Sequence, residues 1–297
     1  MPFTLPRLAL LLLLSSLLLA PQVLANGDPD DHPYYNDDDH SNSASNGQQP
    51  DSSGNGARQT ASEETENQPE ETRSSAAAVD LGPMEATYQA RMTRGVSLRG
   101  EATRSLKQRE DGRWDYRFDV DSFIADVRES AILSYEDNRV TPHEYRYSLR
   151  GRFIRNRATS YDFDWDSMTV RNNERDREHS IADYPQIQDQ LTAQLQLWVD
   201  LKAGKTQMEY LVADNGDVDD YQFEVLGEET IDTENFGKVD TIKVWRVRDE
   251  DSPRSTIMWF APEWDYLLVK LEQREDGGED FDIFLKKADI AGQRIRP

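Results

Sequence analysis

The stretch Trp114–Asp121, which reads WDYRFDVD, decides the fold class of this chain. Its apolar residues, Trp114, Tyr116, Phe118 and Val120, alternate strictly with charged residues. In a β-strand, successive side chains point to opposite faces, so this order collects the apolar side chains on one face and the charged ones on the other. The stretch therefore predicts an antiparallel strand with one buried and one solvated face.

Similar runs recur toward both ends of the chain and predict further strands. They lie at Met84–Met92, Tyr145–Leu149, Tyr161–Trp165, Tyr221–Val225, Val239–Val247, Ser255–Phe260, Tyr266–Glu272 and Phe281–Leu285. Turn-forming pairs such as Asp111-Gly112 and Asn215-Gly216 separate them and favour hairpins between neighbours. We expect a mainly β fold, with about ten or more strands in one large curved antiparallel sheet or half-barrel.

One segment breaks the alternation and predicts an amphipathic helix in the concave face of the sheet. Its apolar residues recur at spacings of four, four and three: Ile187, Leu191, Leu195 and Trp198. Its polar face carries glutamines: Gln188, Gln190, Gln194 and Gln196. Pro185 suits the first helical position and Gly204 the stop, so we expect a helix of about four turns between two blocks of strands. Two alternatives stay open: the helix plugs the sheet as ordinary core, or it forms the lid of an apolar cavity.

Large aromatic residues on the expected strands indicate a ligand cavity inside the sheet. Curved sheets and barrels with aromatic interiors often hold apolar ligands, although aromatic residues also favour strands simply because they pack well there. The residues expected to line such a cavity are Trp114, Tyr116, Phe118, Tyr145, Tyr147, Leu191, Trp198, Trp245 and Trp259.

Residues 1–25 are typical of a secretory signal peptide. Arg7 precedes an apolar run, Pro21 ends it, and Ala25 with Val23 fits a peptidase site. The run is too short to span about 30 Å of hydrocarbon as a helix, which disfavours the alternative of an uncleaved anchor. We therefore expect cleavage after Ala25, export to the periplasm, and a mature protein that does not span the membrane.

Residues 26–80 predict a disordered acidic linker, followed by a β-rich periplasmic domain over residues 81–290. The linker holds thirteen Asp and Glu against Arg58 and Arg73 and shows no apolar period, so it cannot bury enough surface to fold. His32 and His40 stand among aspartates there, a composition that suits divalent metals. No spacing fixes a coordination geometry, so we expect a solvated tail and no metal.

The composition excludes several classes of partner and chemistry. Asp and Glu number 57 against 34 Lys and Arg, a net charge of −23, and such a surface repels nucleic acid and anionic lipid. The chain has no cysteine, which excludes disulfides, a thiol nucleophile and a lipid-modified cysteine. The sequence contains no recognisable motif of a serine hydrolase, a metalloprotease or a phosphate-binding loop, and we expect no catalytic residue and no cofactor.

Two carboxylate clusters offer an alternative of the enzyme class. Asp162, Asp164 and Asp166 share one face of an expected strand, which we assign to solvent. The second cluster departs from the order of a calcium-binding EF-hand loop; it consists of Asp214, Asp217, Asp219 and Asp220. The rival interpretation is a hydrolase of an envelope polymer that uses Asp164 and Asp166.

Several stretches resemble exported bacterial proteins of the domain of unknown function 3108 family. They are the runs that start at Met84, Gly100, Trp114 and Tyr161, residues 189–201 with the Ala-Gly-Lys that follows, the runs at Gly227 and Gly237, and residues 259–266. The resemblance implies a periplasmic β-rich domain, similar to the LolA and LolB lipoprotein carriers, whose curved sheet and helical plug enclose a hydrophobic cavity. The family offers no catalytic residue to carry over, and the acidic N-terminal segment departs from the compact N-terminus expected of it.

Together these patterns predict a non-enzymatic periplasmic protein. Its expected activity is to bind a lipid-like ligand or an envelope protein in the curved sheet. The alternatives are an interaction module in envelope assembly or stress signalling, and the hydrolase of an envelope polymer.

Overall fold

The computed structural model describes residues 78–94, 96–123, 125–151, 155–214, 217–249 and 251–296. Three sequence predictions fall outside these residues: the signal peptide at 1–25, the acidic linker up to residue 77 with its His32 and His40 patch, and the turn at Asn215-Gly216. The described fold is that of the β-rich domain.

Within these ranges the domain contains fifteen β-strands, one α-helix and one short 3-10 helix. The first block of strands comprises β1 (Met84–Arg94), β2 (Val96–Gln108), β3 (Trp114–Ser122), β4 (Ala125–Glu136), β5 (Arg139–Gly151), β6 (Arg157–Asp164), β7 (Thr169–Asn172) and β8 (Arg177–Ser180). After α1 (Gln190–Lys202) come β9 (Gln207–Asp214), β10 (Asp217–Thr233), β11 (Gly237–Val247), β12 (Arg254–Ala261), the 3-10 helix η1 (Pro262–Trp264), β13 (Leu267–Glu275), β14 (Asp280–Ile290) and β15 (Gln293–Ile295). Neither helix of the described residues is long and apolar enough to cross a membrane.

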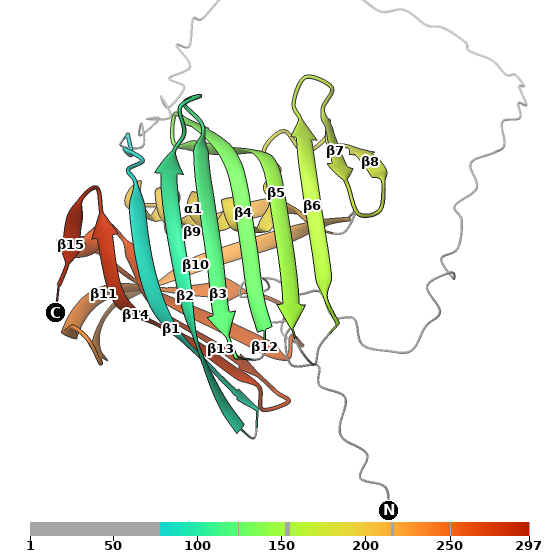
Figure 1. Ribbon diagram of the computed structural model, residues 1–297. Coiled ribbons are helices and arrows are strands. Elements are labelled where there is room, and N and C mark those ends of the chain that lie inside the picture. The colour runs from blue at the N-terminus through green and yellow to red at the C-terminus, as the bar shows by residue number, and fades with distance from the viewer. Residues whose placement is uncertain are drawn as a thin grey trace, which may run out of the picture. The chain divides into compact units, whose positions relative to one another are not determined.

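All strands join one antiparallel sheet, in which most sequence neighbours also pair in space (Figure 1). Strands β1–β8 form a first wall in sequential order and β9–β14 form a second wall, and the two walls join where β1 pairs with β14. β15 pairs with β14 off this path, and β8 and β9 are the edge strands. The prediction of a mainly β fold with one large curved antiparallel sheet is confirmed.

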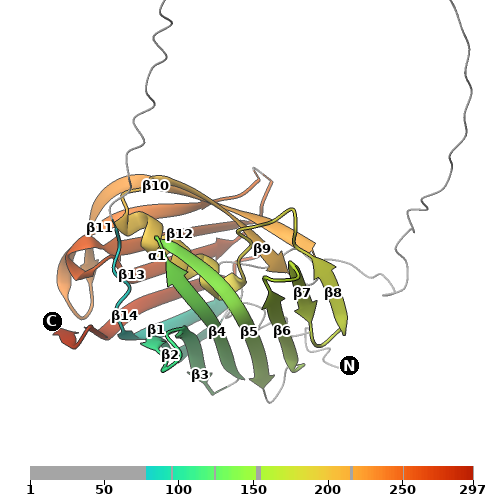
Figure 2. The ribbon, with the colours of Figure 1, turned by 90° about the horizontal axis from the view of Figure 1, so that it is seen from above.

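The sheet bends so that its two walls face each other with α1 between them (Figure 2). We call the side of the sheet that faces α1 the interior face and the opposite side the outer face. β3 follows the predicted alternation: its four apolar residues are buried on the interior face, while Asp115 and Arg117 form an ion pair at 2.7 Å on the outer face.

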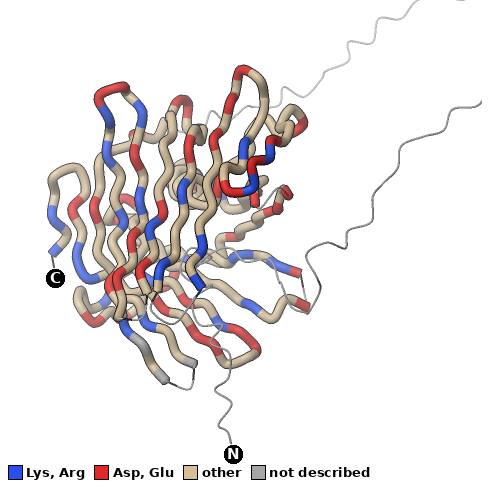
Figure 3. Tube along the Cα trace, turned by 45° about the vertical axis from the view of Figure 1, so that its right-hand side comes forward, with Lys and Arg blue, Asp and Glu red and all other residues tan. Residues whose placement is uncertain are grey.

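Acidic and basic residues are interspersed along the strands of the sheet (Figure 3). On the outer face, ion pairs join neighbouring strands, such as Arg146 of β5 with Asp162 of β6 at 2.6 Å and Arg274 of β13 with Asp282 of β14 at 2.7 Å. Exposed pairs of this kind contribute about 0–1 kcal/mol each. The stability of the sheet therefore comes mainly from its interior and its backbone hydrogen bonds.

The helix begins at Gln190, not at Pro185 as the sequence pattern predicted. Asp189 is the N-cap, and its carboxylate accepts the backbone N–H groups of Leu191 and Thr192, both at 2.8 Å. The Thr192 hydroxyl in turn accepts the backbone N–H of Asp189 at 3.0 Å. This reciprocal capping satisfies three backbone donors at the helix start and fixes where α1 begins.

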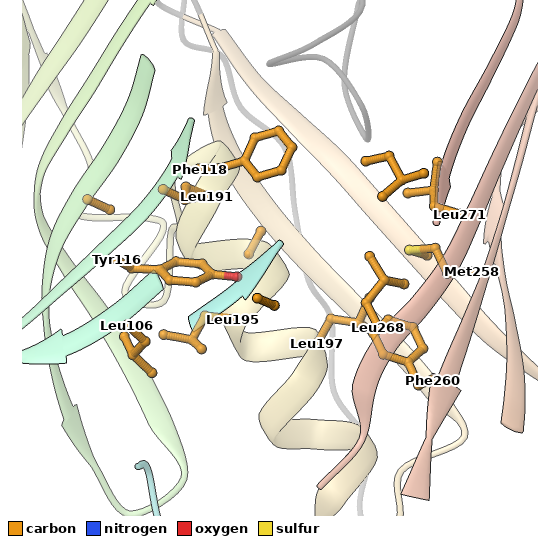
Figure 4. Packing of buried hydrophobic residues seen from close by; sticks show 14 of the residues in the cluster. Leu106, Tyr116, Phe118, Leu191, Leu195, Leu197, Met258, Phe260, Leu268 and Leu271 are labelled. Carbon is orange, nitrogen blue, oxygen red and sulfur yellow. The ribbon is translucent and has the colours of Figure 1, made fainter. Parts of the chain in front are cut away.

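α1 is buried on nearly all sides, which an amphipathic pattern does not predict. Leu191 and Leu195 of the predicted apolar stripe are buried, and so is Leu197 outside it. Figure 4 shows Leu195 beside Leu106 of the first wall and Leu197 beside Leu268 of the second. Each fully buried leucine contributes about 1.5–3 kcal/mol, so α1 holds the two walls together as shared core.

The glutamines expected on a polar face bind the strands instead. Gln196 accepts the backbone N–H of Val140 at 2.8 Å and donates to the carbonyl of Asn138 at 2.9 Å, while Gln188, just before the helix, donates to the carbonyl of Val140 at 2.9 Å. Buried amides require such partners, and these bonds fix α1 to the turn between β4 and β5. The helix ends as predicted, with Gly204 at φ 82° after its last turn.

Candidate functional site

A cleft of about 410 Å³ lies between the edge strands of the sheet. It separates β6–β8 of the first wall from β9 and β10 of the second, and we call it the seam cleft. Its apolar and aromatic lining residues are Tyr161, Val170, Ile181, Tyr184, Ile187, Ala213 and Val218. The polar groups in it are Asn172, His179, Ser180 and Asp217. A cleft that combines apolar side chains with polar groups in this way can hold a small molecule.

An aromatic row leads from the seam cleft into the interior. The ring of Tyr161 stacks on that of Tyr145, with centroids 5.7 Å apart and an interplanar angle of 16°. On the other side, Phe163 meets Tyr161 edge-on at 6.5 Å and stacks on Trp165 at 6.1 Å. Aromatic pairs contribute about 0.5–1.5 kcal/mol beyond their burial, so this row gives the cleft a rigid wall.

A buried chain of polar groups connects the aromatic row to α1. The Tyr145 hydroxyl lies 2.7 Å from a carboxyl oxygen of Glu129 and 3.0 Å from the side-chain oxygen of Gln190. The Gln190 amide nitrogen donates to Asp214 at 3.2 Å. Because a phenol has one proton to donate, a protonated Glu129 completes the arrangement: Glu129 donates to Tyr145, and Tyr145 donates to Gln190.

The pKa values of these buried carboxyls agree with that proton. Burial raises the pKa of Glu129 to about 8 and that of Asp189 to about 7. Burial, together with the neighbouring Asp219 carboxylate, raises the pKa of Asp214 to about 6. The low dielectric of the interior penalises the charged form of each acid, so Glu129 holds its proton near neutral pH.

The interior beside α1 is closely packed. A residual space of about 30 Å³ remains there, between side chains of both walls such as Tyr116 and Phe260, and this is about the volume of one water molecule. Arg104 donates to the side-chain oxygen of Gln194 at 2.7 Å, and its guanidinium lies 5.2 Å from the ring centre of Phe118. Beside the helix, the side chains therefore leave no room for a ligand, and α1 acts there as ordinary core.

Seven of the nine residues expected to line a cavity belong to the interior. Tyr147 is half-buried on the interior face of β5. Trp198 is half-buried on α1, and its indole N–H donates to the carbonyl of Asp265 at 2.7 Å. The five that are fully buried are Trp114, Tyr116, Phe118, Tyr145 and Leu191.

Trp245 and Trp259 lie on the outer face, not inside the sheet as expected. The indole N–H of Trp259 donates to Glu229 at 3.0 Å, and the Lys270 ammonium lies 4.6 Å from the centre of its ring. Alternation along β12 gives the interior position to the neighbouring Met258, and cross-strand pairing puts Trp245 on the same side as Trp259.

Neither Glu129 nor the seam cleft was predicted from the sequence, for different reasons. Glu129 takes an inward position on β4 between Val127 and Ala131, and an acid within an otherwise apolar alternation is a signal that the sequence itself contains. The cleft has no such signal, because β8 and β9 lie on either side of α1 in the sequence and approach each other only when the sheet bends.

The first carboxylate cluster has structural roles. Asp164 accepts the backbone N–H groups of Asp166 and Ser167, both at 3.0 Å, which closes the turn between β6 and β7. Asp162 forms its ion pair with Arg146 on the outer face. In the described part of the chain, no group of three or more His, Asp or Glu residues is placed to hold a metal ion.

Comparison with known proteins assigns this sheet to a family. The family model described as "Protein of unknown function (DUF3108)" matches residues 85–286, which run from β1 into β14. The chain belongs to the DUF3108 family. The resemblance that the sequence motifs indicated is thereby confirmed. No curated protein matches this DUF3108 chain.

Several solved structures are similar to this DUF3108 protein. A β-barrel-like protein of domain of unknown function DUF1849 from Brucella abortus is 13% identical, over 72% of this chain and 99% of that chain, with a TM-score of 0.47. A putative outer membrane lipoprotein-sorting protein domain from Vibrio parahaemolyticus is 11% identical, over 70% of this chain and 85% of that chain, with a TM-score of 0.20. A DUF1329 family protein from Desulfovibrio piger is 12% identical, over 70% and 85%, with a TM-score of 0.21.

Proposed function

We propose that this DUF3108 protein binds an apolar, lipid-like ligand between its two walls and catalyses no reaction. The observation that carries the proposal is the seam cleft. Its volume of about 410 Å³ falls within the range of about 300–1,000 Å³ found for small-molecule pockets. Because β8 and β9 do not pair with each other, no ladder of backbone hydrogen bonds between these two strands closes the cleft.

The lining of the cleft favours an apolar chain as the ligand. Burial of apolar surface contributes about 25 cal/mol per Å², so contact with the half-buried Val218 is the main apolar source of affinity in this proposal. Asn172 and His179 supply hydrogen-bonding groups, and a few such groups are what orients a ligand within an apolar pocket.

The proposed place of action is the periplasm, after export and removal of residues 1–25. The support for this location is the sequence pattern of a basic residue, an apolar run and a small residue at Ala25. Edman sequencing of the mature protein from its native host tests this location. We expect Asn26 to be the first residue.

Binding of dodecanol to the mature chain tests the proposed function. In Val218→Glu a charge replaces an apolar side chain in the seam cleft, and we expect at least a ten-fold loss of affinity by titration calorimetry. Gln222→Glu adds the same charge on the same strand at an exposed position, so it should keep the wild-type affinity. Circular dichroism verifies that both variants are folded.

Two outcomes would overturn the proposal. The first is a wild-type protein that binds no dodecanol. The second is an equal affinity for dodecanol in Val218→Glu and Gln222→Glu, which would show that the seam cleft takes no part in binding.

A further inference from the structure

Three arginines gather on the second wall, and we call them the arginine cluster. They are Arg246 on β11, Arg248 just beyond its end and Arg254 at the start of β12. Arg246 is only 7% exposed, and its guanidinium lies 4.0 Å from the centre of the Tyr221 ring. Arg248 donates to the hydroxyl of Thr256 at 3.0 Å. The chain thus places buried positive charge inside a sheet whose interior is otherwise largely apolar.

The arginine cluster lies at the end of the interior away from α1. Arg246 pairs with Thr256, and the same row of the sheet continues through Gln273 and Phe281 to Met92, close to the end of β1. Thr256 is four residues from Phe260, which packs beside α1, a separation of about 13 Å along the strand. Thr256 and Gln273 are buried polar residues of this row, and Phe281 and Met92 beyond them are buried apolar ones, so the row leads from guanidinium groups to apolar side chains.

Some donors of the arginine cluster have no acceptor. The Nε and Nη1 atoms of Arg246 and the Nη1 atom of Arg254 are buried and make no hydrogen bond to any described residue. A buried charged donor without an acceptor loses its hydration and gains nothing in return. Arginine cannot escape this penalty by releasing its proton. Since native proteins rarely leave such groups unpaired, these donors are where an acceptor from outside the chain would bind.

Two carboxylates act on the cluster. Glu275 binds Arg254 at 2.5 Å, and Asp219 acts on Arg246 as a further negative charge. Burial, with the nearby charges of Arg246 and Arg254, lowers the pKa of Arg248 to about 9. That direction reflects repulsion between the cations as well as desolvation. An anion bound among them would relieve both effects.

We propose that Arg246 and Arg254 bind an oxyanion, a carboxylate or phosphate group, inside the sheet. The planar guanidinium group fits both kinds of anion through parallel N–H···O bonds. The inference rests on the proposed function in one respect: the ligand between the walls is an amphiphile, whose anionic head group meets the arginine cluster while its apolar chain lies against the neighbouring apolar side chains. The net charge of −23 repels anions from the surface, so this interior site is selective for a ligand that also gains from apolar burial.

Titration of the mature protein with three probes tests this inference: dodecanoate, dodecanol and inorganic phosphate. Dodecanoate and dodecanol share the apolar chain and differ in the anionic head group. We expect wild type to bind dodecanoate at least ten-fold more tightly than dodecanol. Arg246→Gln should lose that preference, with at least a ten-fold weaker affinity for dodecanoate and less than a two-fold change for dodecanol. Arg128→Gln is the control, because Arg128 pairs with Asp119 on the outer face of the first wall.

The outcomes separate this inference from the proposed function. Equal affinities of wild type for dodecanoate and dodecanol would overturn the oxyanion site and leave the proposed function standing. Phosphate binding that Arg246→Gln abolishes, without binding of either dodecyl probe, would support the oxyanion site with a free anion as occupant and overturn the proposed function. No binding of any probe would overturn both. If Arg246→Gln does not fold, Arg254→Gln at the half-buried neighbour serves in its place, with the same expected loss of preference.

Discussion

The two ends of the interior handle buried ionisable groups in different ways. At the helix end, burial raises the pKa of Glu129 to about 8 and that of Asp189 to about 7, so each acid reduces its own charge by holding a proton. At the arginine end, Arg246 keeps its charge, because a guanidinium does not release its proton in a protein. One oxygen each of Glu129 and Asp189 also lacks a hydrogen-bond partner among the described residues, but a protonated acid carries no net charge, whereas the unpaired donors of Arg246 belong to a charged group. The type of buried group, rather than its burial alone, therefore separates a structural core from a candidate binding site.

Of the four predicted changes in the free energy of unfolding, the largest is a loss of stability at the helix end as the pH increases. The pKa of Glu129 rises from an ordinary value of 4.5 to about 8 in the folded protein, so the folded state binds its proton more tightly than the unfolded state. Stability therefore falls as the pH rises from about 5 to about 8. The side chain in Glu129→Gln cannot ionise. Over this pH range the free energy of unfolding should therefore fall by about 4 kcal/mol less in this variant than in wild type.

Urea unfolding of both proteins at pH 5 and pH 9 measures this difference in the free energy of unfolding. Glu144→Gln is a suitable control, because Glu144 is an exposed acid on the neighbouring strand β5. An identical pH dependence of wild type and Glu129→Gln would contradict the assignment of a proton to Glu129.

Removal of core volume at the helix end should have the next largest effect. Leu195 is 1% exposed, and Leu195→Ala leaves a cavity between α1 and the first wall. We expect a loss of about 3 kcal/mol in the free energy of unfolding. Leu226→Ala removes the same atoms at a position that is 51% exposed and should change stability by less than about 0.5 kcal/mol. Similar losses in the two variants, measured by thermal unfolding, would show that the helix is not core.

Removal of a charge at the arginine end should act in the opposite direction. In the ligand-free protein, Arg246→Met replaces a buried, incompletely paired cation with an apolar side chain of similar length. We expect the free energy of unfolding to rise by about 1–2 kcal/mol. Arg117→Met, on the outer face of β3, breaks an exposed pair and should change stability by less than about 1 kcal/mol. A clear loss of stability in Arg246→Met would mean that the chain itself compensates this charge.

Removal of the helix cap should have the smallest effect of the four. Asp189→Ala loses two hydrogen bonds to the first turn of α1, and we expect a loss of about 1 kcal/mol. Asp183→Ala removes an exposed carboxylate from the segment before the helix and should leave the unfolding temperature unchanged. A loss above about 3 kcal/mol in Asp189→Ala would show that this acid does more than cap the helix.

The sheet could be predicted from the sequence where inward positions are consistently apolar. In β3 every inward residue is aromatic or aliphatic, so alternation alone identifies the strand. β2 did not stand out in the same way, because its inward positions include Gly100, Ala102 and Arg104. Small and charged residues at those places remove the hydrophobic period, although the pairing with β1 and β3 stabilises the strand regardless.

The helix start and the direction of Trp245 required tertiary information. Pro185 and Asp189 both suit a helix start by local rules, and the bridge between Gln188 and Val212 of β9 keeps the preceding segment out of the helix. Along β11, apolar residues occupy both faces, and Arg246 takes an inward position while Trp245 faces outward. Period-two patterns cannot assign a face to a strand of this kind.

The candidate site depended most on non-local structure. The residues of the seam cleft come from β6–β8, the segment before α1 and the β9–β10 hairpin, and no short motif contains them. The arginine cluster likewise joins two strands across a turn. Its members look like ordinary surface charges in the sequence, and only their inward positions and burial distinguish them.

The pairing of β1 with β14 sets the order in which this fold forms. Met84 lies opposite Ile290, so the joint between the walls has to wait until almost the whole domain is present. Closure of so long a loop loses chain entropy before any contact compensates it, and folds rich in distant pairings form slowly. The first wall, by contrast, grows one hairpin at a time. Until β14 arrives, β1 presents an unpaired backbone edge, which is where the unfinished chain is most open to association with another molecule.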